Sequence, residues 1–413
     1  MRDHFAVLVC FACSPVKGSE EGVGWSWVML AAEHFEKVVV ITSDENLSAC
    51  KAGDSLWHVD FVAPSRSILC FDRRYKFWRF VEKLPLKPGL EWSYGYWLSR
   101  ASALISEFHS TAMVIHHVTF ANGRQALPRP LDFSGKLVWG PIGGILTTPP
   151  VVINLISSFV TKSHLRLRNM YISRMLQKNK NNGSYQDRKI FCAGELTSRA
   201  LGCVTGENHP FLPEIELDKP KATRKLSSSN LIRLIWTGGR TTELKGWALL
   251  ELIIKCLADR IQVSVVLSIF VSDYFPAADR IKRFSNQNIA IDIITGADRA
   301  AVMNAISNSD LLLSTSLHDL TSSAMAEAAC LGTPAFGFKV GEMQSIFNRD
   351  NFIEIQLLDD RSQLVKDYCA QLALLLNDAE KLRQIKNTAA KNRPDIGFKN
   401  ARNFIQETGI YAL

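Results

Sequence analysis

The sequence predicts an α/β protein made of two Rossmann-like, doubly wound domains that face a cleft. Buried strands alternate with helices in both halves of the chain, and a segment rich in proline, lysine and serine separates the halves. The length of 413 residues agrees, because each half is long enough to bury its own core. We expect an N-terminal domain over 1–210, a linker over 211–230 and a C-terminal domain over 231–395.

The N-terminal half opens on Phe5–Ala12, a continuous apolar run typical of a strand buried on both faces. A glycine-rich loop over 14–24 follows, and Trp25–Phe35 is predicted to be a helix. The alternation then continues. Further strands are predicted at Lys37–Thr42, Ala112–His116, Lys136–Trp139 and Lys189–Cys192.

The C-terminal half repeats the same alternation. Its last helices, over 361–390 and 398–408, are amphipathic, and Pro394 and Gly397 separate them. The other predicted helices span 246–258, 298–307 and 321–331. The predicted strands are Ile232–Trp236, Gln262–Phe270, Ala290–Ile294, Asp310–Ser314 and Pro334–Phe338.

Composition narrows the class of protein. The chain has 48 Lys+Arg against 40 Asp+Glu, and this charge of +8 permits a phosphate ligand, an acidic membrane or nucleic acid. The nine cysteines are odd in number and scattered, which indicates a reduced, cytoplasmic protein with buried thiols. Cys10 and Cys13 are interpreted as packed thiols, because no second pair completes a zinc site. We expect neither a signal peptide nor a transmembrane helix, since the apolar runs are short or interrupted by charges.

Two cations follow the first strand of the C-terminal half. The segment Thr237–Gly246 contains Gly239, Arg240 and Lys245, and it leads into a helix. Cations at the carboxyl edge of a strand, beside a helix start, suit a diphosphate. A polar loop with surface cations is the alternative interpretation, and the segment alone leaves both open.

A second polar group follows the strand that ends at Ser314. Asp319 precedes a helix that Thr321 or Ser322 can cap, and the first N–H groups of this helix suit a phosphate. Glu327 lies about two turns into the same helix, which is otherwise apolar. A carboxylate there favours ligand hydroxyls such as a ribose diol, and an internal ion pair with Arg or Lys is the alternative. Both groups are predicted at the same sheet edge.

These residues resemble the C-terminal domain of the retaining GT-B glycosyltransferases of family 4. Gly239-Arg240, Lys245-Gly246 and the spacing from Asp319 to Glu327 follow the family pattern, except that its usual Glu-x7-Glu begins here with Asp319.

Motifs in the N-terminal half are similar to a bacterial branch of that family. They are the PxxGSExGVGW loop from Pro15 to Trp25, His116-His117-Val118-Thr119, and the WGPIGG segment Trp139–Gly144. His117 is predicted to point to the strand face opposite His116. A buried role for His116 stays open beside the role that the resemblance implies. The resemblance also implies that the C-terminal helix, within 396–413, crosses back onto the N-terminal domain.

The resemblance implies a hexosyltransferase that moves a sugar from a nucleotide diphosphosugar to a hydroxyl acceptor with retention, in surface polysaccharide or glycolipid assembly. The acceptor would be a carbohydrate or lipid-linked. No Asp-x-Asp occurs, so neither a metal nor another cofactor is expected, and no GxGxxG indicates a nicotinamide enzyme. A non-catalytic nucleotide-sugar-binding subunit and a GT-B-like epimerase remain alternatives. The implied catalytic residues are Arg240, Lys245, Asp319 and His116; the implied donor-binding residues are Gly18, Gly22, Gly239, Glu327, Thr321 and Ser322.

Basic and aromatic residues gather over 73–97 and 151–178. Segments of this type favour an anionic membrane surface, and a solvated face with packed aromatics is the equal alternative. No nucleic-acid-binding motif accompanies them, so nucleic acid is not an expected partner. We expect a cytoplasmic protein, peripheral on the inner face of the membrane if these segments bind lipid.

Overall fold

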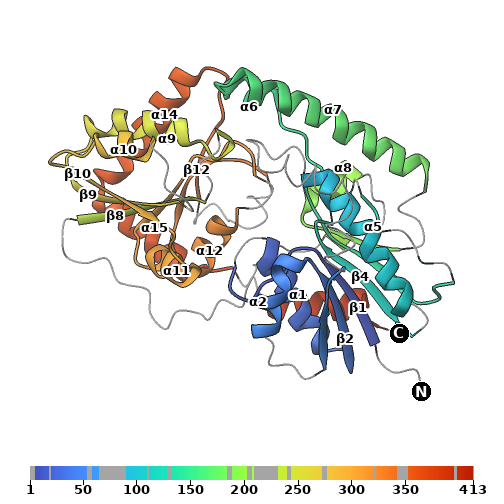
Figure 1. Cartoon of the computed structure of the whole chain (residues 1–413). Helices are drawn as coiled ribbons and strands as arrows, with labels where there is room; N and C mark the ends of the chain where they lie inside the picture. Colours follow the sequence, from blue (N-terminus) through green and yellow to red (C-terminus); the bar gives the residue numbers. More distant parts are fainter. Residues whose placement is uncertain are drawn as a thin grey trace. The chain divides into compact units, whose positions relative to one another are not determined.

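The computed structural model forms two compact units (Figure 1). Unit 1 comprises the described residues of Met1–Leu146, Met170–Glu216 and Ile396–Leu413, and unit 2 comprises those of Thr147–Asn169 and Leu217–Asp395. The structure describes residues 5–17, 20–53, 58–64, 90–108, 111–121, 123, 125–127, 130, 132–183, 188–201, 207–208, 231–239, 243–271, 277–319, 322–341, 352–394 and 398–412.

Residues 147–169 depart from the predicted domain boundary, because they belong to unit 2 and not to the N-terminal domain. Their apolar side chains explain the difference. Val152, Leu155 and Leu165 are buried in the same hydrophobic cluster as Trp247 of unit 2. The predicted linker over 211–230 lies outside the described residues.

Unit 1 is built on a parallel sheet with the strand order β3-β2-β1-β4-β5-β6-β7. This order, with crossovers on both sides of β1, is that of a doubly wound sheet. Its strands are β1 (Phe5–Cys10), β2 (Lys37–Thr42), β3 (Val59–Val62), β4 (Val114–Thr119), β5 (Lys136–Ile142), β6 (Lys189–Cys192) and β7 (Glu207–Asn208).

Helices cover both faces of this sheet, as the fully buried β1 requires. Alternate β1 residues from Ala6 pack in one cluster with α1 (Glu20–Ala32) and α16 (Phe398–Thr408), while those from Phe5 pack with α5 (Leu90–Phe108). The C-terminal helix therefore crosses back onto unit 1, which confirms the expectation. The other helices assigned here are α2 (Asp44–Gly53) and α8 (Glu195–Leu201), and α7 (Phe159–Asn181) contributes residues to both units.

Helix α1 begins at Glu20, five residues before the predicted start at Trp25. Gly22 and Gly24, two of the glycines that indicated a loop, lie inside the helix. A Cβ on Gly24 would come within 2.1 Å of the carbonyl oxygen of Ala12, so this glycine serves close helix–strand packing.

Unit 2 has a second parallel sheet, with the order β10-β9-β8-β11-β12-β13. The predicted helix over 361–390 is two helices, because Asp378 caps a new one by accepting the N–H of Lys381 at 2.9 Å. The strands are β8 (Leu231–Gly239), β9 (Ser264–Val271), β10 (Ile289–Thr295), β11 (Leu311–Ser314), β12 (Ala335–Phe338) and β13 (Phe352–Ile355). The helices are α6 (Pro150–Leu155), η1 (Glu243–Lys245, a 3₁₀ turn), α9 (Trp247–Ala258), α10 (Ala277–Lys282), α11 (Arg299–Ser307), α12 (Ser323–Leu331), α14 (Arg361–Leu376) and α15 (Ala379–Lys391).

The described cysteines agree with the interpretation as buried thiols. Six of these seven are buried, and Cys256 is partly exposed. Cys10 and Cys13 are both fully buried, and the Cys50 thiol donates to the Cys13 carbonyl at 3.1 Å. Cys70 and Cys203 lie outside the described residues.

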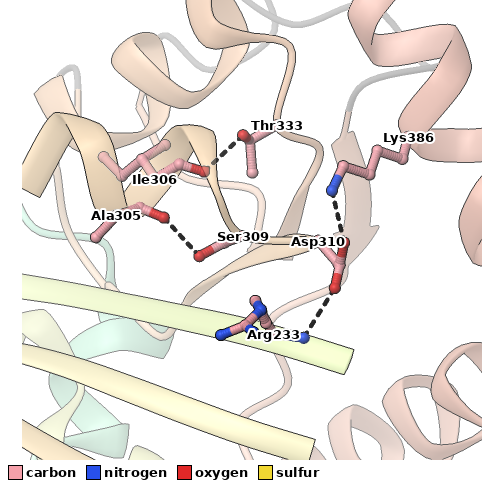
Figure 2. Close-up of polar contacts among 7 residues, drawn as sticks. All are labelled: Arg233, Ala305, Ile306, Ser309, Asp310, Thr333 and Lys386. Atoms are coloured by element: carbon pink, nitrogen blue, oxygen red, sulfur yellow. Dashed lines mark hydrogen bonds and ion pairs between the residues drawn. The ribbon is translucent and has the colours of Figure 1, made fainter. Parts of the chain in front are cut away.

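A buried ion pair fixes the start of β11 (Figure 2). The Asp310 carboxylate accepts from Lys386 Nζ at 2.5 Å and from the backbone N–H of Arg233 at 2.8 Å. Asp310 and Lys386 are each 5% exposed, so each charge depends on the other. The contacts join α15, β11 and β8 at the amino edge of the sheet.

We predict that Lys386→Met lowers the free energy of unfolding by about 3–5 kcal/mol, because it leaves the Asp310 charge buried and uncompensated. Urea unfolding measures the loss. The double variant Lys386→Met/Asp310→Asn should recover part of it, since no isolated charge remains and the amide oxygen still accepts from Arg233. A single variant as stable as the wild type would contradict the ion pair.

Candidate functional site

The polar segments predicted to meet in the C-terminal half do so at the carboxyl edge of the unit 2 sheet. Strands β8 and β11 are neighbours and run parallel. The loop after β8 carries Lys245, and the loop after β11 carries Asp319. Ligands of doubly wound sheets bind at this edge, where the strand order reverses. Here the reversal falls between β8 and β11, so the two loops flank it.

A close backbone contact holds the η1 turn against the end of β11. Thr315 Oγ1 donates to the Lys245 carbonyl at 3.0 Å and accepts from Trp236 Nε1 at 3.0 Å. Gly246 has φ +71°, and a Cβ there would lie 1.8 Å from the Thr315 carbonyl oxygen. Only glycine fits both conditions, so the Lys245-Gly246 pair is a geometric requirement of this loop.

The Lys245 ammonium contacts the Asp319 carboxylate at 2.5 Å. Their side chains are 35% and 16% exposed, so both remain within reach of a ligand. Burial lowers the pKa of neighbouring His318 to about 4, and the charges of Arg168 and Lys245 also lower it, against the opposite effect of Asp319. At neutral pH the site therefore presents the Lys245 ammonium and a neutral imidazole to an anionic group.

Glu327 is paired inside unit 2. Its carboxylate lies 2.8 Å from Arg299 NH2 at the start of α11, and the two side chains are 10% and 16% exposed. Burial raises the pKa of Glu327, and the Arg299 guanidinium lowers it in part. The structure thus shows the ion-pair alternative for Glu327. If Glu327 also binds a ribose diol, its carboxylate must accept from those hydroxyls while it remains paired with Arg299.

The remaining predicted donor-site residues divide into two groups. Arg240, Thr321 and Gly18 lie outside the described residues. Gly239 ends β8, and Gly22 is buried in the first turn of α1 rather than in a loop. Ser322 occupies the cap position of α12 but forms no side-chain hydrogen bond to the helix, so it does not cap α12 in the predicted manner.

The resemblance implied that His116 faces an open site. In the structure, His116 is instead fully buried in unit 1. Its Nε2 donates to the Gly140 carbonyl at 2.9 Å, and its Nδ1 accepts from the Tyr411 hydroxyl at 2.7 Å. A carbonyl can only accept, which fixes this tautomer. Burial lowers the pKa of His116 to about 3, so the ring is neutral and both nitrogens are used by the fold.

His117 points to the opposite face of β4, as predicted. Its Nε2 lies 2.5 Å from the Tyr94 hydroxyl of α5, and its ring stacks on Trp139 with centroids 6.2 Å apart. Burial lowers the pKa of His117 to about 3, with smaller contributions from His116 and Arg188.

Two features at these sheet edges had no signal in the sequence. Phe120, directly after β4, has φ +53°, a conformation that costs energy for a bulky residue and occurs at functional sites. Its N–H donates to the Glu20 carboxylate at 2.6 Å.

The second feature lies in unit 2. Glu243 of η1 accepts the N–H groups of Ser157 at 3.3 Å and Ser158 at 3.2 Å, and α7 begins at the next residue. The start of α7 is therefore bonded to the turn that carries Lys245.

The described residues contain no cluster of His, Cys, Asp or Glu arranged to hold a metal ion. Among the same residues, every helix is too short or too polar to cross a membrane.

Comparison with known proteins identifies the fold. No protein-family profile and no curated protein sequence matches the chain. WaaG, a glycosyltransferase involved in lipopolysaccharide biosynthesis, has 13% identity and a TM-score of 0.60 over 98% of this chain and 100% of its own. Sucrose-phosphate synthase from Thermosynechococcus elongatus has 13% identity and a TM-score of 0.59 over 99% of both chains. Anabaena Alr3699/HepE in complex with UDP and glucose has 12% identity and a TM-score of 0.55, over 98% of this chain and 99% of its own. The fold of the protein is GT-B.

We predict that acid destabilises the protein through its buried histidines. The ordinary pKa of 6.5 applies in the unfolded chain, whereas the folded values are about 3. Stability is therefore complete above pH 6.5 and is lost as pH falls, by about 1.4 kcal/mol per pH unit for each histidine. Urea unfolding down to about pH 5, where carboxylates still titrate little, measures this slope. His117→Gln should reduce the slope of stability against pH by the contribution of one histidine. An unchanged slope would contradict a neutral, buried His117 ring.

Proposed function

We propose that the protein is a retaining hexosyltransferase that moves a sugar from a nucleotide diphosphosugar to a hydroxyl acceptor. The observation that carries the proposal is the meeting of Lys245 and Asp319 at the switch point of the donor-side sheet of a GT-B fold. One structure of similar fold holds UDP and glucose, and another belongs to a lipopolysaccharide glycosyltransferase. These similarities favour a carbohydrate or lipid-linked acceptor in surface polysaccharide or glycolipid assembly.

The donor diphosphate would lie against the η1 turn. Arg240 and Lys245 supply the positive charge that stabilises the leaving nucleotide diphosphate. The neutral His318 ring supplies an N–H beside them. The Asp319 carboxylate contacts the Lys245 ammonium at 2.5 Å. When a phosphate takes over that ammonium, Asp319 is released to accept from a hydroxyl of the transferred sugar.

Transfer with retention then needs no nucleophile from the protein. The acceptor hydroxyl attacks the anomeric carbon on the face that the phosphate leaves, and a phosphate oxygen takes the acceptor proton. The protein positions the two substrates and offsets the charge that develops on the leaving group. The nucleotide sugar and a lipid-linked acceptor would meet on the cytoplasmic side, at the inner face of the membrane.

We predict that Arg240→Ala and Lys245→Ala each lower turnover about 100-fold, the usual effect of losing one charge contact to a transition state. Transfer from a panel of nucleotide diphosphosugars measures the effect, with Lys366→Ala, which removes an exposed side chain of α14, as the control. Normal rates in both site variants would reject the donor site. A wild-type chain that binds a donor without transfer would be a binding subunit, and one that converts a nucleotide sugar without acceptor would be an epimerase.

We predict that Glu327→Gln weakens donor binding about tenfold or more, because a ligand hydroxyl loses a charged acceptor. Calorimetric titration of folded protein with the donor measures the change. Arg299→Gln is the matched control, since it breaks the same ion pair from the other side and leaves the carboxylate in place. Equal losses of melting temperature with unchanged donor affinity in both variants would show that the pair is only structural.

A further inference from the structure

Helix α7, labelled in Figure 1, carries four large apolar side chains that are exposed. Of the eight large apolar side chains that are exposed among the described residues, four lie on this helix. Phe159 is 78% exposed, Val160 66%, Leu167 64% and Met170 51%. Large exposed apolar side chains that cluster in this way mark an interaction surface rather than chance exposure.

The same helix has a uniform charge. Between Asp132 and Asp187 the chain contains no acidic residue, while α7 alone contains six lysines and arginines. Of these, Arg166, Arg174, Lys178 and Lys180 are exposed, and all but Lys180 lie on the same side of the helix as the four apolar side chains. The partner of this surface must therefore be anionic as well as apolar.

These seven side chains share one side of the helix, which we call the α7 outer face. It consists of Phe159, Val160, Arg166, Leu167, Met170, Arg174 and Lys178. At about 100° per residue they fall within an arc of about 120°. Leu165, Ile172 and Asn179, which are buried, fall on the opposite side. Leu165 packs in the hydrophobic cluster of unit 2, and Asn179 donates to the Gly123 carbonyl of unit 1. In each unit, the buried side chains of α7 therefore lie opposite to the outer face.

We propose that the α7 outer face docks onto the surface of an anionic phospholipid bilayer. A helix that lies in the interface places apolar side chains at the acyl boundary and basic side chains among the headgroups, which is the distribution found here. A second copy of this chain fits less well, because two faces without acidic residues repel each other. Nucleic acid would bind the basic residues, but it offers no apolar surface for Phe159 and Leu167 to contact. The proposal stands independently of the proposed transferase activity.

Flotation of the full chain with vesicles tests the proposal directly. The protein should bind phosphatidylcholine vesicles that contain phosphatidylglycerol, and it should bind pure phosphatidylcholine vesicles far less. Phe159→Ser/Leu167→Ser should lower binding at least tenfold. Arg166→Gln/Arg174→Gln should lower it by about fivefold per charge, and added salt should reproduce that loss.

Matched controls separate the outer face from general charge and hydrophobicity. Leu252→Ser/Leu374→Ser and Lys255→Gln/Lys366→Gln remove comparable exposed side chains from other helices of unit 2, and they should leave binding unchanged. Because all altered side chains are exposed, every variant should keep the wild-type melting temperature.

Three results would overturn the proposal. The first is equal binding to both kinds of vesicle. The second is equal loss of binding in the outer-face and control variants. The third is an outer face that instead mediates dimerisation in sedimentation or binds RNA while the protein ignores vesicles. Each of these results leaves the donor-binding measurements interpretable, since those use soluble nucleotide sugars.

Discussion

The contact between Gly246 and Thr315 is the constraint on which the candidate site depends. Because no side chain fits between these two backbones, the turn after β8 lies directly on the end of β11. That approach brings Lys245 to Asp319 across the two loops. In the proposed donor site, a cation and a carboxylate that the fold already fixes in place would lose little entropy on binding a diphosphate and a sugar.

The two edges of the unit 2 sheet have different roles. At the amino edge, Asp310 and Lys386 are almost fully buried and bind each other, and the Asp310 carboxylate also accepts a backbone N–H. At the carboxyl edge, Lys245 and Asp319 form a similar pair that solvent still reaches. The first arrangement stabilises the packing of helix on strand. The second keeps its charges exchangeable, as a site that binds and releases a charged substrate requires.

Contacts that follow from the order of the strands could be predicted from the sequence. Contacts between segments that are far apart in the chain could not. Adjacent parallel strands placed Lys245 near Asp319, since their carboxyl ends share an edge. No periodicity in the sequence indicates that His116 hydrogen-bonds to Tyr411, 295 positions away. Nor does any indicate that Glu327 forms an ion pair with Arg299 of the preceding helix. The strands β3, β7 and β13 were missed because they are short edge strands. β7 has two residues, and neither β3 nor β13 has a continuous buried run.

The two units are interleaved along the chain, and this affects how the protein is made. Unit 2 takes residues 147–169 from the middle of the segments that build unit 1, and unit 1 takes 396–413 from the far end. No single cut yields either unit complete. During synthesis, the sheet of unit 1 must therefore wait for α16 to leave the ribosome, while the apolar face that α16 covers stays exposed. The interval between translation of β1 and of Tyr411 is one in which a chaperone has apolar surface to bind.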